Sequence, residues 1–210
     1  MRTLAILPVK RFEIAKTRLR EHLEPAQRSR LAEAMVVDVL DALLESPQLA
    51  GVAVVTNEQT VATVAATRGA IVLRDPTESG QSSAALVGIR HALAAGFERA
   101  LLVPGDCPAL DGDTLAALLQ AGAPPPSVTI VSDRHGSGTN ALLLAPPDAI
   151  EPAFGTGSFA RHERLAEAAG AAFLVESPPA LLLDVDTPED LAALREGAPG
   201  ARTRAVLERL

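Results

Sequence analysis

The chain contains few of the residues on which several classes of protein depend. One cysteine, no tryptophan, no tyrosine and five phenylalanines occur in 210 residues. A single cysteine excludes a disulfide-stapled scaffold. No apolar run reaches the ~18 residues that a membrane-spanning helix needs, and the apolar stretch at the N-terminus ends at Lys10, too early for a secretory signal. We therefore expect a cytoplasmic protein with no membrane partner.

An excess of basic residues is also missing. Lys and Arg number 19 against 26 Asp and Glu, which gives a net charge of −7. A nucleic-acid-binding protein would need a basic face and aromatic rings for stacking, so we expect no nucleic-acid partner. With 48% hydrophobic and 21% charged residues, the chain is not disordered and can build a core of Ala, Val and Leu. The length predicts a single domain over residues 1–210.

Short apolar runs alternate with longer segments rich in Ala and Leu. The runs predict strands at 4–9, 51–56, 70–73, 100–103, 128–131, 141–144, 173–175 and 181–185. The longer segments predict helices at 25–46, 60–68, 83–95, 111–121 and 158–169, and a last one from Thr187. The alternation predicts an α/β fold with a mixed, mainly parallel sheet and helices on both faces. Ligands of such sheets bind at the carboxyl ends of the strands. The tail after Gly197 is left without an assignment.

A basic cluster follows the first predicted strand within eleven residues: Lys10, Arg11, Lys16, Arg18 and Arg20. Lys and Arg neutralise phosphoryl oxygens, so the cluster favours a polyphosphate ligand in a chain that is otherwise acidic. The alternative is a solvated loop with scattered salt bridges. No Gly-x-x-x-x-Gly-Lys-Ser/Thr sequence is present, which excludes a P-loop.

Three aspartate side chains follow predicted strands. Asp106 lies between Gly105 and Cys107 just beyond the strand at 100–103, and Asp184 and Asp186 lie two residues apart at the end of the strand at 181–185. Side chains two apart on a strand point the same way, and paired carboxylates favour a cation between them. We expect Asp106, Asp184 and Asp186 to bind Mg²⁺. The alternative is that they cap turns or the last helix, although Thr187 already provides a helix cap.

Two glycine-rich segments offer sites for a second anion. Thr139 lies in the loop DRHGSGTN between two predicted strands, and Gly155 and Ser158 lead into the helix at 158–169. Backbone N–H groups of such turns and helix starts, together with a hydroxyl, suit an anionic ligand. Glycines also serve plain turns, so neither segment is specific alone. His162 is expected to be a hydrogen-bonded wall residue and not a base.

Five segments in this order resemble a known family: PVKRFEIAKTRL, LLVPGDCPAL, DRHGSGTNALLL, FGTGSFARH and LLLDVDTPEDL. They are similar to the guanylyltransferases of coenzyme F-420 biosynthesis, which join GTP to phosphoenolpyruvate in bacteria or to 2-phospho-L-lactate in archaea. The resemblance spans nearly the whole chain and implies a Rossmann-like, glycosyltransferase-A-type nucleotidyltransferase fold. The Ala- and Arg-rich composition favours phosphoenolpyruvate as the acceptor.

The resemblance implies a role for each candidate residue. The catalytic residues would be Lys16, Arg18 and Asp106. GTP would be bound by Lys10, Lys16, Gly80 and Ser82. The phospho-acid would be bound by Thr139, Gly155 and Ser158. Mg²⁺ would be bound by Asp106, Asp184 and Asp186. A homodimer is left open.

The segment at 80–84, Gly-Gln-Ser-Ser-Ala, departs from the Gly-Leu-Asn-x-Ala of the family. It resembles the Gly-x-Ser-Ser-Ser of the molybdopterin cytidylyltransferases, so cytidylyl transfer stays open as an alternative. Those enzymes open with a Gly-rich loop, which this chain replaces with Pro8-Val9-Lys10. A non-catalytic nucleotide-binding regulatory module is a further alternative. Three carboxylates exceed what nucleotide binding alone requires, which favours an enzyme.

Overall fold

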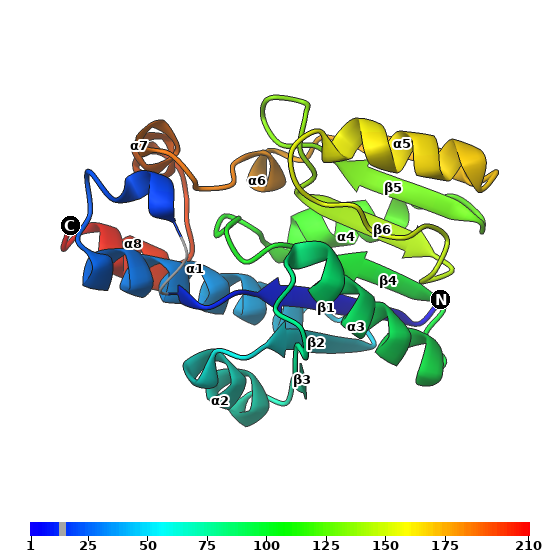
Figure 1. The fold of residues 1–210 in the computed structure, drawn as a ribbon, viewed down its shortest axis with the longest axis horizontal. Helices are drawn as coiled ribbons and strands as arrows, with labels where there is room; N and C mark the ends of the chain where they lie inside the picture. The colour runs from blue at the N-terminus through cyan, green and yellow to red at the C-terminus, as the bar shows by residue number, and fades with distance from the viewer. Residues whose placement is uncertain (13–15) are drawn as a thin grey trace.

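The computed structural model describes residues 1–12 and 16–210, and these residues form one seven-stranded sheet (Figure 1). The strands are β1 (Thr3–Val9), β2 (Gly51–Thr56), β3 (Ile71–Leu73), β4 (Arg99–Leu102), β5 (Ser127–Val131), β6 (Ala141–Ala145) and β7 (Ala172–Glu176). Their order across the sheet is β3-β2-β1-β4-β6-β5-β7. The pairs β1–β2, β1–β4, β2–β3 and β5–β7 are parallel, whereas β6 runs antiparallel to both β4 and β5. The expectation of a mixed, mainly parallel sheet is confirmed.

Helices cover both faces of this sheet, as the alternation predicted. They are η2 (Thr17–Leu19), α1 (Pro25–Glu45), α2 (Gln59–Thr67), α3 (Gln81–Ala94), α4 (Gly112–Gln120), α5 (Ser158–Ala168), α6 (Pro179–Leu182), α7 (Pro188–Glu196) and α8 (Ala201–Leu207). Helices α1, α2 and α4 belong to the core on one face of the sheet, with Ala5 and Leu7 of β1, and α3 and α5 belong to the core on the other face, with Leu4 and Ile6. Burial on both faces explains why β1 reads as a continuous apolar run.

A third, smaller core lies where α1, α7 and η2 meet. Leu19, Leu31, Met35, Val185 and Leu194 are all buried there. Figure 1 shows α8 beside α1, and α7 above them, at the end of the molecule toward which β1 points. This core therefore fixes the segments just after Lys16 and around residue 185 beside the carboxyl ends of the strands.

The reversed strand β6 brings a second loop to the same edge of the sheet. In the antiparallel pair, Leu102 at the end of β4 lies opposite Leu142 near the start of β6. The loop before β6 therefore reaches the edge at which the segment after β4 begins. For this reason residues 132–140 and 103–111 meet there, although the loop precedes its strand.

The segment 181–185 is not a strand, and that prediction was wrong. Pro179 stands in the first turn of α6, where its fixed φ favours a helix, and the chain then continues without pairing to the sheet. Leu181 and Val185 are both fully buried, because this apolar run covers the core at the strand ends. The unassigned tail contains helix α8, whose first N–H groups, of Arg202 and Thr203, donate to Asp38 on α1.

The helix caps follow the sequence closely. Asp111 accepts a hydrogen bond from the N–H of Thr114 at the start of α4, and Thr187 forms a capping box with Asp190 at the start of α7. Among the described residues, no helix is both long enough and apolar enough to cross a membrane.

Gly88 on α3 sets how closely this helix approaches β1. A Cβ atom at Gly88 would lie 2.4 Å from Cγ2 of Ile6, whereas one at Gly112, the first residue of α4, would meet no atom within 4 Å. We expect Gly88→Ala to destabilise the protein by about 1–2 kcal/mol despite the better helix propensity of Ala. Thermal melting should show a fall of a few degrees for Gly88→Ala and none for the matched control Gly112→Ala. A Gly88→Ala protein as stable as wild type would contradict this close packing.

Candidate active site

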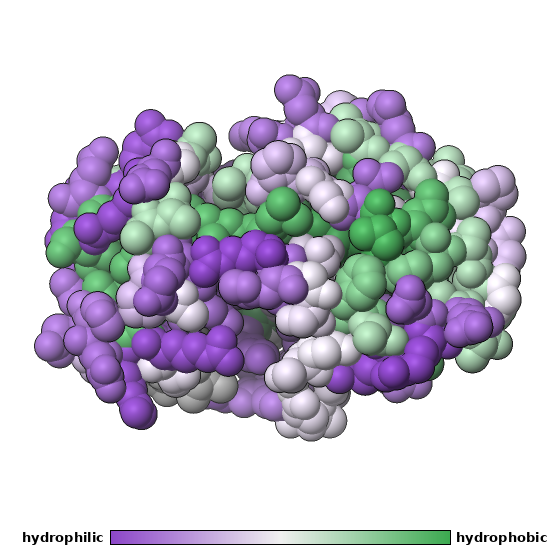
Figure 2. All heavy atoms as spheres, turned by 90° about the horizontal axis from the view of Figure 1, so that it is seen from above, coloured by the Kyte–Doolittle hydropathy of each residue, from purple (hydrophilic) through white to green (hydrophobic). Residues whose placement is uncertain are grey.

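A cavity of about 340 Å³ opens at the carboxyl ends of β1, β2 and β4. Its walls come from the end of β1, from the segments after β1, β2, β3 and β4, from α1 and from the start of α3. The lining residues are Pro8, Val9, Lys10, Arg11, Phe12, Ala32, Val36, Asn57, Asp75, Glu78, Gly80, Gln81, Ala84, Pro104, Gly105 and Asp106. Figure 2 shows a hollow in the middle of one face, bordered by hydrophilic residues. The cavity lies where the fold class predicts a ligand, and it is large enough for a small-molecule substrate.

The two residues predicted to bind nucleotide at the start of α3 lie differently. Gly80 lines the cavity with φ at +108°, a conformation that L side chains rarely adopt, so glycine is required there. Ser82 instead accepts a hydrogen bond from the N–H of Phe154, 2.9 Å from its Oγ. Ser82 therefore joins α3 to the glycine-rich segment before α5, between the cavity and that segment.

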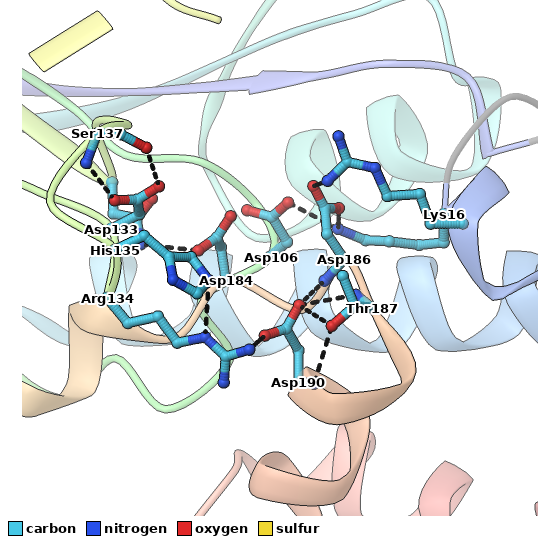
Figure 3. Close-up of polar contacts among 12 residues, drawn as sticks. Lys16, Asp106, Asp133, Arg134, His135, Ser137, Asp184, Asp186, Thr187 and Asp190 are labelled. Carbon is cyan, nitrogen blue, oxygen red and sulfur yellow. Dashed lines mark hydrogen bonds and ion pairs between the residues drawn. The ribbon is translucent and has the colours of Figure 1, made fainter. Parts of the chain in front are cut away.

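Lys16 joins two of the predicted carboxylates (Figure 3). Its Nζ lies 2.7 Å from Oδ2 of Asp106 and 3.0 Å from Oδ1 of Asp186. Only 7% of the Lys16 side chain is exposed. Burial alone would lower the pKa of this ammonium, but the charges of the two carboxylates, with their hydrogen bonds, raise the pKa above its ordinary value of 10.5. Lys16 is therefore a fixed positive charge at the end of β4.

Asp184 lies on the other side of Asp106 in Figure 3. Its Oδ1 accepts a hydrogen bond from Nδ2 of Asn140, at 3.2 Å, and the N–H of Val185 donates to the carbonyl of Asp106. Burial, and then the charge of Asp106, raises the pKa of the Asp184 carboxyl above its ordinary value. The expectation that these carboxylates gather is met, but backbone and side-chain hydrogen bonds hold them, and not a strand.

The carboxylates near Asp106 do not form a complete Mg²⁺ site by themselves among the described residues. No three His, Cys, Asp or Glu side chains among the described residues are arranged as a ready-made metal cage. Mg²⁺ in nucleotide enzymes is usually held by one or two carboxylates together with substrate phosphates. Asp184, whose negative charge is poorly compensated, is the kind of ligand that a divalent cation stabilises. The chemistry of Asp106, Asp184 and Asp186 therefore fits an ion that arrives with a polyphosphate.

The basic cluster does not act as one patch. Arg11 donates to both carboxylate oxygens of Glu78 on the cavity wall, and Lys10 lines the same cavity while exposed. Arg18 is 73% exposed and lies 3.9 Å from Asp186, and Arg20 is exposed. The cluster thus contains one buried cation among the described residues, Lys16, and several exposed ones.

The two segments predicted to bind a second anion meet around three buried polar side chains. Oγ1 of Thr139 lies 2.9 Å from Oγ of Ser158 and 3.0 Å from Nδ1 of His162. Nε2 of His162 accepts the N–H of Ala153 at 2.8 Å. Burial, and to a smaller extent the charge of Arg161, lowers the pKa of His162 to about 4. Thr139 and Ser158 come from different loops, and the structure brings them together as predicted.

The start of α5 is less open than the sequence suggested. The N–H of Ser158 donates to the carbonyl of Gly155, and the N–H of Phe159 donates to the carbonyl of Ser137. Gly155 has φ at +105°. The Arg161 side chain donates to the carbonyls of residues 153, 154 and 156 and so shapes the loop.

Three contributors were not singled out by the sequence analysis. Asn140 and Arg161 carry no spacing signal, although both lie, as Arg134 does, inside the segments DRHGSGTN and FGTGSFARH. The third is Arg134, which lies 2.6 Å from Oδ1 of Asp190 and so ties the loop before β6 to the start of α7 (Figure 3). Asn140 and Arg134 contact carboxylates far away in the chain, and Arg161 contacts backbone carbonyls five to eight residues before it, so residue spacing alone does not reveal these roles.

Solved structures identify the class to which this fold belongs. A nucleotidyl transferase from Methanothermobacter thermautotrophicus superposes with a TM-score of 0.72 at 21% identity, covering 93% of this chain and 96% of that one. A CMP-2-keto-3-deoxy-manno-octonic acid synthetase in complex with CTP superposes with a TM-score of 0.64 at 12% identity over 100% of both chains. The fold is that of the nucleotidyltransferases.

Sequence comparison then identifies the family. The family model described as "Guanylyl transferase CofC like" matches residues 3–210. A Conexibacter woesei protein named phosphoenolpyruvate guanylyltransferase is 48% identical over 218 aligned positions, which cover 100% of this chain and 97% of the relative. A Sphaerobacter thermophilus protein of the same name is 40% identical and covers 95% of each chain. The chain belongs to the CofC-like guanylyl transferase family, as its resemblance implied.

Replacing Lys16 by Met would leave Asp106 and Asp186 without their shared cation. We expect a loss of about 2 kcal/mol at neutral pH, less than for a fully buried pair because both carboxylates reach solvent. Because the pKa of Lys16 is raised on folding, its contribution should be fully present below pH 10.5 and fall above that value. Urea unfolding of wild type and Lys16→Met across this range measures the difference. Lys16→Arg retains the charge and is the control. A difference that does not shrink at alkaline pH would contradict the ion pairs.

His162 should lower the free energy of unfolding as the pH falls below 6.5. Its pKa is about 4 in the folded protein against an ordinary 6.5, so the unfolded chain binds the extra proton first. Its contribution is complete above pH 6.5 and is lost as the pH falls toward 4, at about 1.4 kcal/mol per unit of pKa difference. Subtracting the unfolding free energy of His162→Gln from that of wild type at each pH removes the contribution of the carboxylates. A flat difference between pH 6.5 and 4 would show that His162 is not held neutral.

Proposed function

We propose that this protein transfers GMP from GTP to phosphoenolpyruvate, giving enolpyruvoyl-2-diphospho-5′-guanosine and pyrophosphate, a reaction of coenzyme F-420 biosynthesis. The observation that carries the proposal is full-length similarity, at 48% and 40% identity, to two proteins named for this activity. The cavity, the carboxylates and the Thr139 site lie at one edge of the sheet, as a two-substrate transfer requires. Both substrates are cytoplasmic metabolites, so we place the reaction in the cytoplasm.

In this proposal GTP occupies the cavity at the ends of β1, β2 and β4. The base and ribose would lie between Pro8 and the start of α3, where Gly80 permits a close approach of the ligand. The triphosphate would extend toward Asp106, since this residue closes the cavity wall. Lys10, exposed on the same wall, and Arg18, exposed beside Asp186, are free to turn toward phosphoryl oxygens.

The acceptor would lie beyond Asp106, next to Thr139, Gly155 and Ser158. Asn140 supports this placement, because it follows Thr139 directly and donates to Asp184. An acid bound at Thr139 would therefore have its phosphate near the carboxylates, within reach of the α-phosphorus of GTP. Holding both reactants in this order supplies the proximity on which such transfers depend.

The chemical step is an in-line displacement. A phosphate oxygen of phosphoenolpyruvate attacks the α-phosphorus of GTP, a P–O bond forms, and pyrophosphate leaves with the electron pair of the broken bond. Lys16 is a fixed cation at this point and stabilises the negative charge that develops on phosphoryl oxygens. Asp106, Asp184 and Asp186 would hold Mg²⁺, which when bound draws the charge of the α-phosphate and makes its phosphorus more electrophilic.

The phospho-acid and the base are the two points at which alternatives persist. 2-Phospho-L-lactate differs from phosphoenolpyruvate only in its three-carbon skeleton and would use the same anion contacts. The Gly-Gln-Ser-Ser segment at 80–83, with Gly80 and Gln81 on the cavity wall, keeps CTP as the competing nucleotide. A regulatory module that binds nucleotide without turnover would release no pyrophosphate.

Pyrophosphate release with each nucleoside triphosphate and each phospho-acid, with and without Mg²⁺, separates these functions. We expect turnover with GTP and phosphoenolpyruvate that depends on Mg²⁺. Asp106→Asn should lower kcat at least ~100-fold, and it should also lower the melting temperature by a few degrees, because it removes one of the two carboxylates paired with the buried Lys16 ammonium while Asp186 remains. Asp113→Asn, an exposed residue on α4, is the matched control. Full activity of Asp106→Asn, or turnover with CTP alone, would reject the assignment.

A further inference from the structure

Three polar side chains, of Thr139, Ser158 and His162, are joined by hydrogen bonds in the wall of the proposed acceptor site. Thr139 is 8% exposed, Ser158 1% and His162 0%. A buried polar group must find a hydrogen-bond partner, since an unsatisfied one costs about 1–3 kcal/mol. The hydrogen-bond partners of these three side chains therefore determine which atom carries each proton and toward which atom it points.

The backbone fixes the tautomer of His162. The N–H of Ala153 can only donate, and it points to Nε2 of His162 at 2.8 Å. Nε2 therefore carries no proton. An imidazole without a proton on Nε2 is neutral and has its proton on Nδ1, in agreement with a pKa near 4. Nδ1–H lies 3.0 Å from Oγ1 of Thr139 and donates to it.

Ser158 supplies a second donor to the same oxygen. Its Oγ lies 2.9 Å from Oγ1 of Thr139, and no other hydrogen bond of this hydroxyl is present among the described residues. With 1% of the residue exposed, water does not serve as the acceptor. The hydroxyl proton of Ser158 therefore goes to Thr139.

We propose that His162 and Ser158 are positioning residues that turn the Thr139 hydroxyl proton outward, toward the anionic oxygens of the phospho-acid. A hydroxyl oxygen has two lone pairs, and these two donors occupy both. Of the protons on these three side chains, only the hydroxyl proton of Thr139 then has no acceptor among the described residues. Thr139 is also the most exposed of the three residues. The inference rests on the proposed function for the identity of the acid.

The hydroxyl of Ser158 therefore has another role than the direct contact with the acid that its sequence context predicted. The Ser158 hydroxyl acts through Thr139, and Thr139 is the group that touches the acid. A donor that is already oriented loses little entropy when the ligand binds. The specificity of the site for an oxyanion follows, since a ligand that offered a donor would meet the Thr139 proton.

Two isosteric substitutions at His162 separate its two hydrogen bonds. The amide of Asn occupies the position of Nδ1 and can still donate to Thr139, whereas the amide of Gln occupies the position of Nε2 and can still accept from Ala153. Steady-state kinetics should give a KM for phosphoenolpyruvate about tenfold higher for His162→Gln and less than threefold higher for His162→Asn. The KM for GTP should stay unchanged in both. A purely structural role predicts instead that GTP and phosphoenolpyruvate are affected alike.

Coupling to Thr139 provides the second measurement. Thr139→Val should raise the KM for phosphoenolpyruvate more than His162→Gln does, and Thr139→Ser should restore it. The double variant His162→Gln/Thr139→Val should bind the acid no more weakly than Thr139→Val alone, because His162 acts through a hydroxyl that is already absent. Multiplicative losses in the double variant, or an unchanged KM in Thr139→Val, would overturn the proposal.

The tautomer gives a readout that does not depend on turnover. The ¹⁵N chemical shifts of the His162 ring in the wild-type protein should show a protonated Nδ1 and an unprotonated Nε2 at neutral pH. A proton on Nε2 would overturn the proposal whatever the enzyme's substrate. An inactive wild type with the expected tautomer would instead reject the proposed acceptor and leave the orientation of Thr139 supported.

Discussion

The ion pairs of Lys16 are the constraint on which the site depends. Lys16 is separated from Asp106 by 90 residues and from Asp186 by 170, and still contacts both within 3.0 Å. Three like charges at the end of a strand would otherwise repel one another and move apart. A buried ammonium offsets part of that repulsion while the nucleotide is absent, so the carboxylates can be held close together before any cation arrives. The small core around Leu19 and Val185 serves the same end, because it fixes both partners of the ion pair.

The sheet topology supplies the remaining geometry. Because β6 runs antiparallel to β4, the loop before β6 lies beside the segment that follows β4. The cavity is therefore built from the parallel half of the sheet, and the cluster of Thr139, Ser158 and His162 from the reversed half. Asp106 lies at the boundary, where the proposed reaction would bring two substrates together. Under that proposal the order of the strands separates the two substrates without the need for a second domain.

Much of this arrangement could be predicted from the sequence, and each prediction that was wrong or missing has a physical cause. Alternation located the strands and helices because the burial of each element is encoded in its own residues. The segment 181–185 misled because an apolar run that covers strand ends looks like a buried strand. The tail was unassigned because α8 depends on Asp38, which lies 164 residues away. Asp184 and Asp186 were placed at the site for an incorrect reason, since their position follows from contacts with Asn140 and Lys16 and not from strand alternation.

The loop before β6 is fastened to the carboxylate segment at two points. Asn140 holds Asp184, and Arg134 holds Asp190, whose carboxylate also accepts the N–H groups of Asp186 and Thr187. The number of loop residues between Arg134 and Asn140 fixes the distance between these two contacts. An insertion or a grafted loop of another length would pull directly on the carboxylates. If the proposed acceptor site is redesigned, side chains should therefore be exchanged at constant loop length, since the loop also holds the carboxylates in place.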